Sequence, residues 1–62
     1  MRTYFVKVGF YVFTQPYAYQ TIIKCLPEDV IDVAKAAVVN KYRNCNSLII
    51  ESITIQNIVL LD

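Results

Sequence analysis

This chain of 62 residues has no histidine, no tryptophan and only one glycine, Gly9. Without histidine, a nucleophilic cysteine or a zinc site lacks its usual partner. A single glycine rules out the glycine-rich loops that bind phosphate groups. Nor can a Ser/His/Asp catalytic set be assembled. We therefore expect a protein that is not an enzyme and that has no catalytic, metal-binding or cofactor-binding residues.

The chain also has almost no excess of positive or negative charge. Six Lys and Arg residues oppose five Asp and Glu residues, for a net charge of +1. Nucleic-acid-binding proteins usually carry a concentrated basic field, so this balance disfavours them as a class. It also leaves little repulsion between copies of the chain, which favours self-association.

Long apolar runs are missing as well. No segment approaches the ~20 apolar residues that cross a bilayer. We expect no secretory signal, because Lys7 breaks the N-terminal apolar run and no small-residue cleavage site follows. We expect a cytoplasmic protein without a membrane partner.

The only two cysteines are Cys25 and Cys45. A helix of about 16 residues is predicted between them and would be roughly 24 Å long, whereas a disulfide needs Cα atoms within about 7 Å. We expect reduced thiols and a reducing compartment. Three carboxylates, Glu28, Asp29 and Asp32, fall at the start of that helix, where they complement its dipole. We interpret them as solvated charges.

Apolar surface, by contrast, is present in excess. The chain is 56% hydrophobic, with five tyrosines and three phenylalanines. A domain of this length buries only roughly 60% of the surface that its unfolded chain exposes. Part of the apolar surface should therefore face outward, and large exposed apolar patches usually mark contact with another molecule.

Residues 3–14 predict the first strand, because they are rich in β-branched and aromatic types. The even positions from Tyr4 to Val12 are all apolar, whereas the odd positions are mixed, as in a strand with an inner and an outer face. Residues 19–25 predict a second strand.

We expect a four-residue loop, 15–18, between these strands, because proline is disfavoured at the end of a two-residue hairpin loop. That loop sets Thr14 opposite Tyr19, and Val12, Phe10 and Val8 opposite Thr21, Ile23 and Cys25. It also groups Lys7, Gln20 and Lys24 on the outer face. This grouping of polar side chains supports the assignment of alternate residues to the two faces.

Pro27 predicts the start of a helix, because proline suits the first helical position. Apolar residues at helical spacing predict one stripe that faces the sheet: Val30, Ile31, Ala34, Ala37, Val38 and Tyr42.

Residues 48–55 predict a third strand, with Ile53 and Ile55 on one face and Ser52 and Thr54 on the other. Gln56-Asn57 interrupts it, and two interpretations stay open. The pair is a tight turn into a short fourth strand, or a bulge in one long strand whose tail, 58–61, reaches beyond its own domain. The second is slightly favoured.

The predicted fold is therefore a single α+β domain, 1–62: a two-layer β-β-α-β sandwich in which one helix covers one face of an antiparallel three-stranded sheet, with or without a short fourth strand. The other face has no second layer. Its candidate partner-binding residues are Phe5, Lys7, Tyr11, Phe13, Gln20, Ile22 and Lys24.

Protein contact explains more of this sequence than any other function. Aromatic residues are enriched at interface centres, and a homodimer that joins sheet edges or stacks open faces would bury the surplus apolar area. We expect a stoichiometric, steric inhibitor or adaptor, and specificity from the lysines and glutamine around the aromatic anchors. In size and layout, though in no shared motif, the chain resembles phage-encoded inhibitors of host enzymes, toxins or defence systems, so no family is assigned.

The alternative function is single-stranded nucleic-acid binding. Aromatic rings would stack the bases while lysines follow the phosphates, as on other open sheet faces. The residues that could form this platform are Phe5, Lys7, Tyr11, Phe13, Tyr19 and Lys24.

Overall fold

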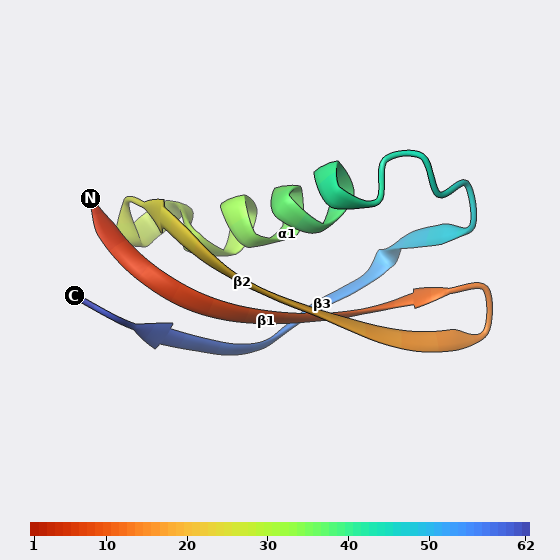
Figure 1. Ribbon diagram of the computed structural model, residues 1–62, viewed down its shortest axis with the longest axis horizontal. Helices are drawn as coiled ribbons and strands as arrows, with labels where there is room; N and C mark the ends of the chain where they lie inside the picture. Colours follow the sequence, from red (N-terminus) through yellow and green to blue (C-terminus); the bar gives the residue numbers. More distant parts are fainter.

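The first strand of the chain is the central strand of the sheet. Figure 1 shows the computed structural model, which describes residues 1–62. The elements follow in this order: β1 (Arg2–Val12), β2 (Gln15–Cys25), a 3-10 turn (Pro27–Asp29), α1 (Val30–Lys41) and β3 (Leu48–Leu60). The strands form one antiparallel sheet in the order β2-β1-β3. The predicted α+β class, with a three-stranded antiparallel sheet and one helix, is confirmed, and there is no fourth strand.

The hydrophobic core lies between α1 and one face of the sheet (Figure 1). Val6 and Val8 are fully buried, because they lie on the central strand beneath the helix. Ala34 and Val38, one turn apart on α1, are also fully buried, since their short side chains let the helix approach the sheet closely. Nine residues form this core: Tyr4, Val6, Val8, Phe10, Ile23, Cys25, Ala34, Val38 and Ile53.

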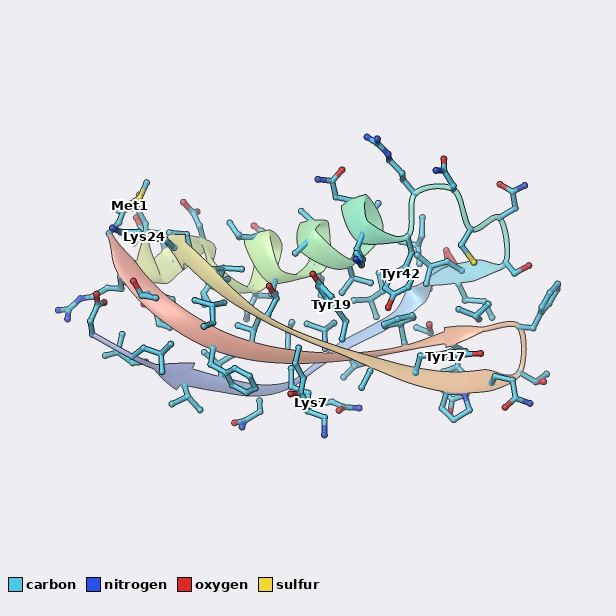
Figure 2. All side chains as sticks on the ribbon, in the orientation of Figure 1. Met1, Lys7, Tyr17, Tyr19, Lys24 and Tyr42 are labelled. Carbon is cyan, nitrogen blue, oxygen red and sulfur yellow. The ribbon has the colours of Figure 1, made fainter.

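An aromatic cluster closes the core at the C-terminal end of α1. The ring of Tyr42 packs on Phe10, with ring centroids 5.0 Å apart, and meets the ring of Tyr19 edge-on at 6.0 Å. Figure 2 shows Tyr19 and Tyr42 between the sheet and the helix. These contacts fix the point where the chain leaves the helix and turns back toward β3.

The turn between β1 and β2 is shorter than the sequence predicted. Phe13 and Thr14 alone join the strands, and Val12 pairs with Gln15, so the predicted four-residue loop is wrong. Val8 pairs with Tyr19 instead of Cys25, a slip of six residues. Because six is an even number, every side chain of both strands stays on its predicted face.

Pro16 explains why the two-residue turn is compatible with this sequence. It does not close the loop but is the second residue of β2, where it pairs with Tyr11. Proline is tolerated on an edge strand where the missing N–H would have faced away from the sheet.

Phe13 has a backbone conformation that is rare for a bulky residue. Its φ angle is +56°, in the left-handed region, which costs an L-residue roughly 1–2 kcal/mol and is normally occupied by glycine in such turns. The Phe13 N–H donates to the Ser47 carbonyl at 3.1 Å, which holds the turn against the loop before β3. The ring itself is 70% exposed.

Helix α1 is shorter than predicted and covers only part of the sheet. It begins at Val30, because Pro27–Asp29 forms a separate 3-10 turn. Its 12 residues give a length of about 18 Å, while the molecule is 35 Å long. Figure 1 shows the β1–β2 hairpin reaching past the end of the helix. Ile31 was predicted to face the sheet, but it is 49% exposed because it lies beside the covered stripe.

Strand β3 is one long strand with a bulge at Gln56. Asn57 pairs with Lys7 and Ile55 with Val8, so Gln56 has no partner on β1. The favoured interpretation of Gln56-Asn57 as a bulge is therefore right. The expectation that the tail leaves its own domain is wrong, since Leu60 pairs with Tyr4 in the same sheet.

A second irregularity lies farther back in β3. Thr54 pairs with Gly9 and Ile49 with Tyr11, so that residues 50–53 lie opposite a single position of β1. The Ser52 hydroxyl accepts the Tyr11 N–H at 2.8 Å and donates to the Ile49 carbonyl at 2.6 Å. This hydroxyl thus replaces a missing ladder bond and holds the wide bulge closed.

The turn geometry predicts an unusual result for Phe13→Gly. We expect this variant to be more stable than Phe13→Ala by about 1 kcal/mol, because glycine adopts positive φ without strain and both variants lack the ring. For a domain of this size that difference is a shift of about 4–8 °C in melting temperature. Thermal unfolding followed by circular dichroism measures it. Equal melting temperatures for the two variants would show that residue 13 is not left-handed in solution.

Candidate protein-interaction face

The outer face of the sheet, the one turned away from α1, carries almost all the predicted site residues. It is formed by the odd residues of β1 and the even residues of β2, whose side chains share one side. In Figure 2, Lys7 points away from the helix. Six of the seven candidates lie on this face: Phe5, Lys7, Tyr11, Gln20, Ile22 and Lys24. The seventh, Phe13, lies in the turn at its end.

One apolar cluster, the terminal patch, lies on the outer face toward the chain ends. It consists of Ile22, Phe5 and Val59, which are directly opposite one another on the three strands. Phe5 is half-buried between its neighbours, whereas Ile22 is 62% exposed. Cross-strand aromatic and β-branched neighbours stabilise a sheet, so this patch supports the fold and also presents apolar surface to solvent.

A second apolar cluster, the hairpin patch, lies at the opposite end of the outer face. Pro16, Tyr11 and Ile49 are cross-strand neighbours on the three strands, and Phe13 follows at the tip. Tyr11 is 46% exposed. The helix does not reach this end of the molecule (Figure 1). The loop before β3 holds the turn through the Phe13–Ser47 hydrogen bond, and the Phe13 ring stays exposed.

Two cross-strand rows of polar or small residues separate the two patches. Gln20, Lys7 and Asn57 form one cross-strand row, and Ala18, Gly9 and Thr54 form the next. The Gln56 side chain lies over Gly9, where a Cβ atom would overlap its amide group. A side chain at this position would therefore displace the flexible end of the Gln56 side chain.

Two lysines lie on the outer face. Lys7 lies in its middle and Lys24 at the end near the termini. The carboxylate of Asp62 also lies at that end, where it accepts the Thr3 N–H at 2.9 Å and the Thr3 hydroxyl at 3.2 Å. A guanidinium N–H of Arg2 also reaches the Asp62 carbonyl at 3.3 Å. The two ends of the chain are thus held together by hydrogen bonds.

These contacts lower the pKa of Asp62. The Thr3 backbone N–H is the main cause, and the Thr3 hydroxyl and the charges of Lys24 and Arg2 act in the same direction, while partial desolvation opposes them. Hydrogen bonds and nearby cations favour the charged form of a carboxyl group.

Sequence reasoning missed the contribution of β3 to the outer face. Val59 and Ile49 complete the two patches, but neither was a candidate, because the register of β3 against β1 was not predicted. Asn57 and Val59 are two positions apart beyond the bulge, so their side chains lie on the same face of the strand. This spacing was the one indication in the sequence that β3 contributes to the outer face. Pro16 was missed because it was placed in a loop.

The molecule contains neither a cluster of metal-binding side chains nor a disulfide. No group of three or more Cys, Asp or Glu side chains could share a metal ion. Cys25 is a buried core residue and Cys45 is half-buried, and neither is in a disulfide. No helix has the length and apolar character needed to cross a membrane.

Comparison of the chain with protein-family models, with curated proteins and with solved structures gave no match. The functional argument therefore depends on the geometry of the outer face.

The Asp62 contacts predict a pH dependence. A carboxyl group with a lowered folded-state pKa stabilises the fold above its ordinary pKa of 3.8, and this contribution is lost as the pH falls through the folded-state value. We therefore expect Asp62→Asn to melt below the wild type at neutral pH, with the gap closing in strong acid. Melting temperatures from pH 2 to 7 measure this. A gap that does not change with pH would contradict the assigned contacts.

Proposed function

We propose that this chain is a small, non-enzymatic protein-binding module that acts as a stoichiometric steric inhibitor or adaptor, as a homodimer and in the cytoplasm. In this proposal the chain is a two-layer β-β-α-β sandwich whose outer face is the docking surface. The observation that carries the proposal is the exposure of aromatic and aliphatic side chains on that face, which no helix or strand of residues 1–62 covers.

The hairpin patch supplies the strongest anchors. Burying a Phe side chain is worth roughly 1.5–3 kcal/mol, and Tyr residues are enriched among the residues that dominate interface energies. Phe13 presents 70% of its surface to solvent from a strained backbone position. Such strain is frequent at ligand-contacting positions, where the surrounding structure maintains it. The exposed ring is therefore better explained by binding than by folding.

The polar row between the patches supports orientation. Lys7 and Gln20 are direct cross-strand neighbours in the middle of the face, and no acidic residue pairs with them across the strands. A partner with a carboxylate opposite Lys7 would match this charge, and complementary charges fix the orientation of docking more than its strength.

Single-stranded nucleic acid remains the second candidate, because rings and lysines share the outer face. Successive bases stack on neighbouring rings. Phe5 and Tyr11 are six positions apart on β1, about 20 Å at 3.3 Å per residue, and Lys7 and Gly9 lie between them. Aliphatic Ile22, Val59 and Ile49 complete the patches instead of further rings. These features favour a protein surface.

The decisive experiment is affinity capture from a lysate of the source cells, with mass spectrometry of the retained proteins. We expect the wild type to retain a partner in equimolar amount and the double variant Tyr11→Ala/Phe13→Gly to lose it while remaining folded. Ile31→Ala is the matched control, because Ile31 is as exposed as Tyr11 but lies on the helix side. Equal capture by all three proteins would overturn the proposal.

A fluorescence titration with mixed single-stranded oligonucleotides tests the second candidate. At about 150 mM salt we expect no tight binding, because the net charge of +1 provides little counterion release. Submicromolar affinity that disappears in Tyr11→Ala would replace the protein-binding proposal with nucleic-acid binding.

A further inference from the structure

The backbone groups of β1 reveal which strand positions face the free edges of the sheet. The Thr3 carbonyl accepts the Leu61 N–H at 2.8 Å, and the Tyr11 N–H bonds to Ser52, so odd residues of β1 direct their backbone groups toward β3. Directions alternate along a strand, so even residues of β1 bond to β2. Their partners on β2 are odd residues, such as Tyr19 opposite Val8.

The even residues of β2 therefore direct their backbone N–H and C=O groups to the free edge. Pro16 is one of them, and its missing N–H is on that edge. The segment Ala18–Lys24 follows without proline or bulge, since the pairing of β1 with β2 is continuous from end to end. It contains one charged residue, Lys24. A long, regular and nearly uncharged edge is a template for pairing with another strand.

The other free edge, along β3, is much less suited to pairing. The bulge at Gln56 and the wide bulge over residues 50–53 divide the strand into short regular pieces. Bulges twist and interrupt an edge and so protect it against strand addition. The two edges of this sheet are therefore not equivalent.

We infer that β2 is the homodimer interface, and that the segment Ala18–Lys24 pairs antiparallel with the same segment of a second copy. The result is a six-stranded sheet that runs through both copies around a two-fold axis, as is common for isologous dimers. This inference rests on the homodimer part of the proposed function and is independent of the docking of the outer face.

Charge favours edge pairing over the stacking of two outer faces. Stacking would bury Lys7 in the middle of the interface, where no carboxylate pairs with it across the strands, and an unpaired buried charge is costly. In antiparallel edge pairing the Lys24 side chains of the two copies lie at opposite ends of the paired segment. The outer faces then form one continuous surface and stay open.

The helices also fit this arrangement. Helix α1 packs against all three strands, so its axis lies over β1. In the six-stranded sheet the β1 strands of the two copies would be three strand spacings apart, about 14 Å. A helix with its side chains is about 10–12 Å wide. The two helices can therefore lie on the same side of the sheet without overlap.

Substitution of one outward residue of β2 tests the inference. We expect the wild type to sediment near twice 7.1 kDa at micromolar concentration, and Gln20→Pro to sediment as a monomer, because it loses an outward N–H. Gln20→Ala is the matched control that keeps this N–H, and Leu60→Pro makes the same change on the β3 edge. Both controls should remain dimeric. A monomeric wild type, or a dimer that persists in Gln20→Pro, would overturn the inference.

Amide hydrogen exchange of the wild type provides a test that does not depend on the folding of a variant. The outward amides of Ala18, Gln20 and Ile22 should be protected at high protein concentration and lose at least tenfold of that protection on dilution to the monomer. The outward amide of Leu60 on β3 should exchange fast throughout. Fast exchange along β2 at every concentration would contradict the interface.

The outcomes also separate this inference from the proposed docking function. If Tyr11→Ala/Phe13→Gly remains dimeric but loses its partner, the outer face and the β2 edge act independently. If the wild type is monomeric but still captures a partner, only the β2 interface is wrong.

Discussion

The packing of α1 onto the middle of β1 is the contact on which the rest of the structure depends. Val6 and Val8 meet Ala34 and Val38 there, and these four side chains are fully buried. Residues 1–62 contain only this one helix, and it covers one face of the sheet. The same packing places β2 and β3 at free edges. The open face and the open edges therefore both follow from a core that is formed by one helix on one side of a three-stranded sheet.

The uncovered surfaces differ in character. The outer face presents exposed side chains in two apolar patches around a polar row with Lys7 in its middle. The edge of β2 presents backbone donors and acceptors and hardly any charge. Side-chain patches allow selective recognition of a different protein, whereas a regular strand edge favours a second copy of itself. A single small sheet can thus support two kinds of contact at once, because they use different atoms.

The fold class and the faces of the sheet could be predicted because they follow from local alternation. The apolar even positions of β1 and the positions of Ile53 and Ile55 were read correctly. The hairpin register could not be predicted, because it depends on Phe13 accepting a left-handed conformation that sequence rules reserve for glycine. The register of β3 also escaped prediction. It depends on how the bulges at Gln56 and at residues 50–53 fit against β1, which is a tertiary property.

The two chain ends lie side by side at the end of the sheet opposite the β1–β2 turn (Figure 1). Arg2 and Thr3 are hydrogen-bonded to Asp62, so a short peptide could join the termini without moving either strand. Adjacent termini are the usual requirement for circular permutation. In a circular permutant, the loop between α1 and β3 would be a suitable place for the new termini. A backbone-cyclised form, with the two original ends joined, would leave the hairpin tip free for immobilisation or display.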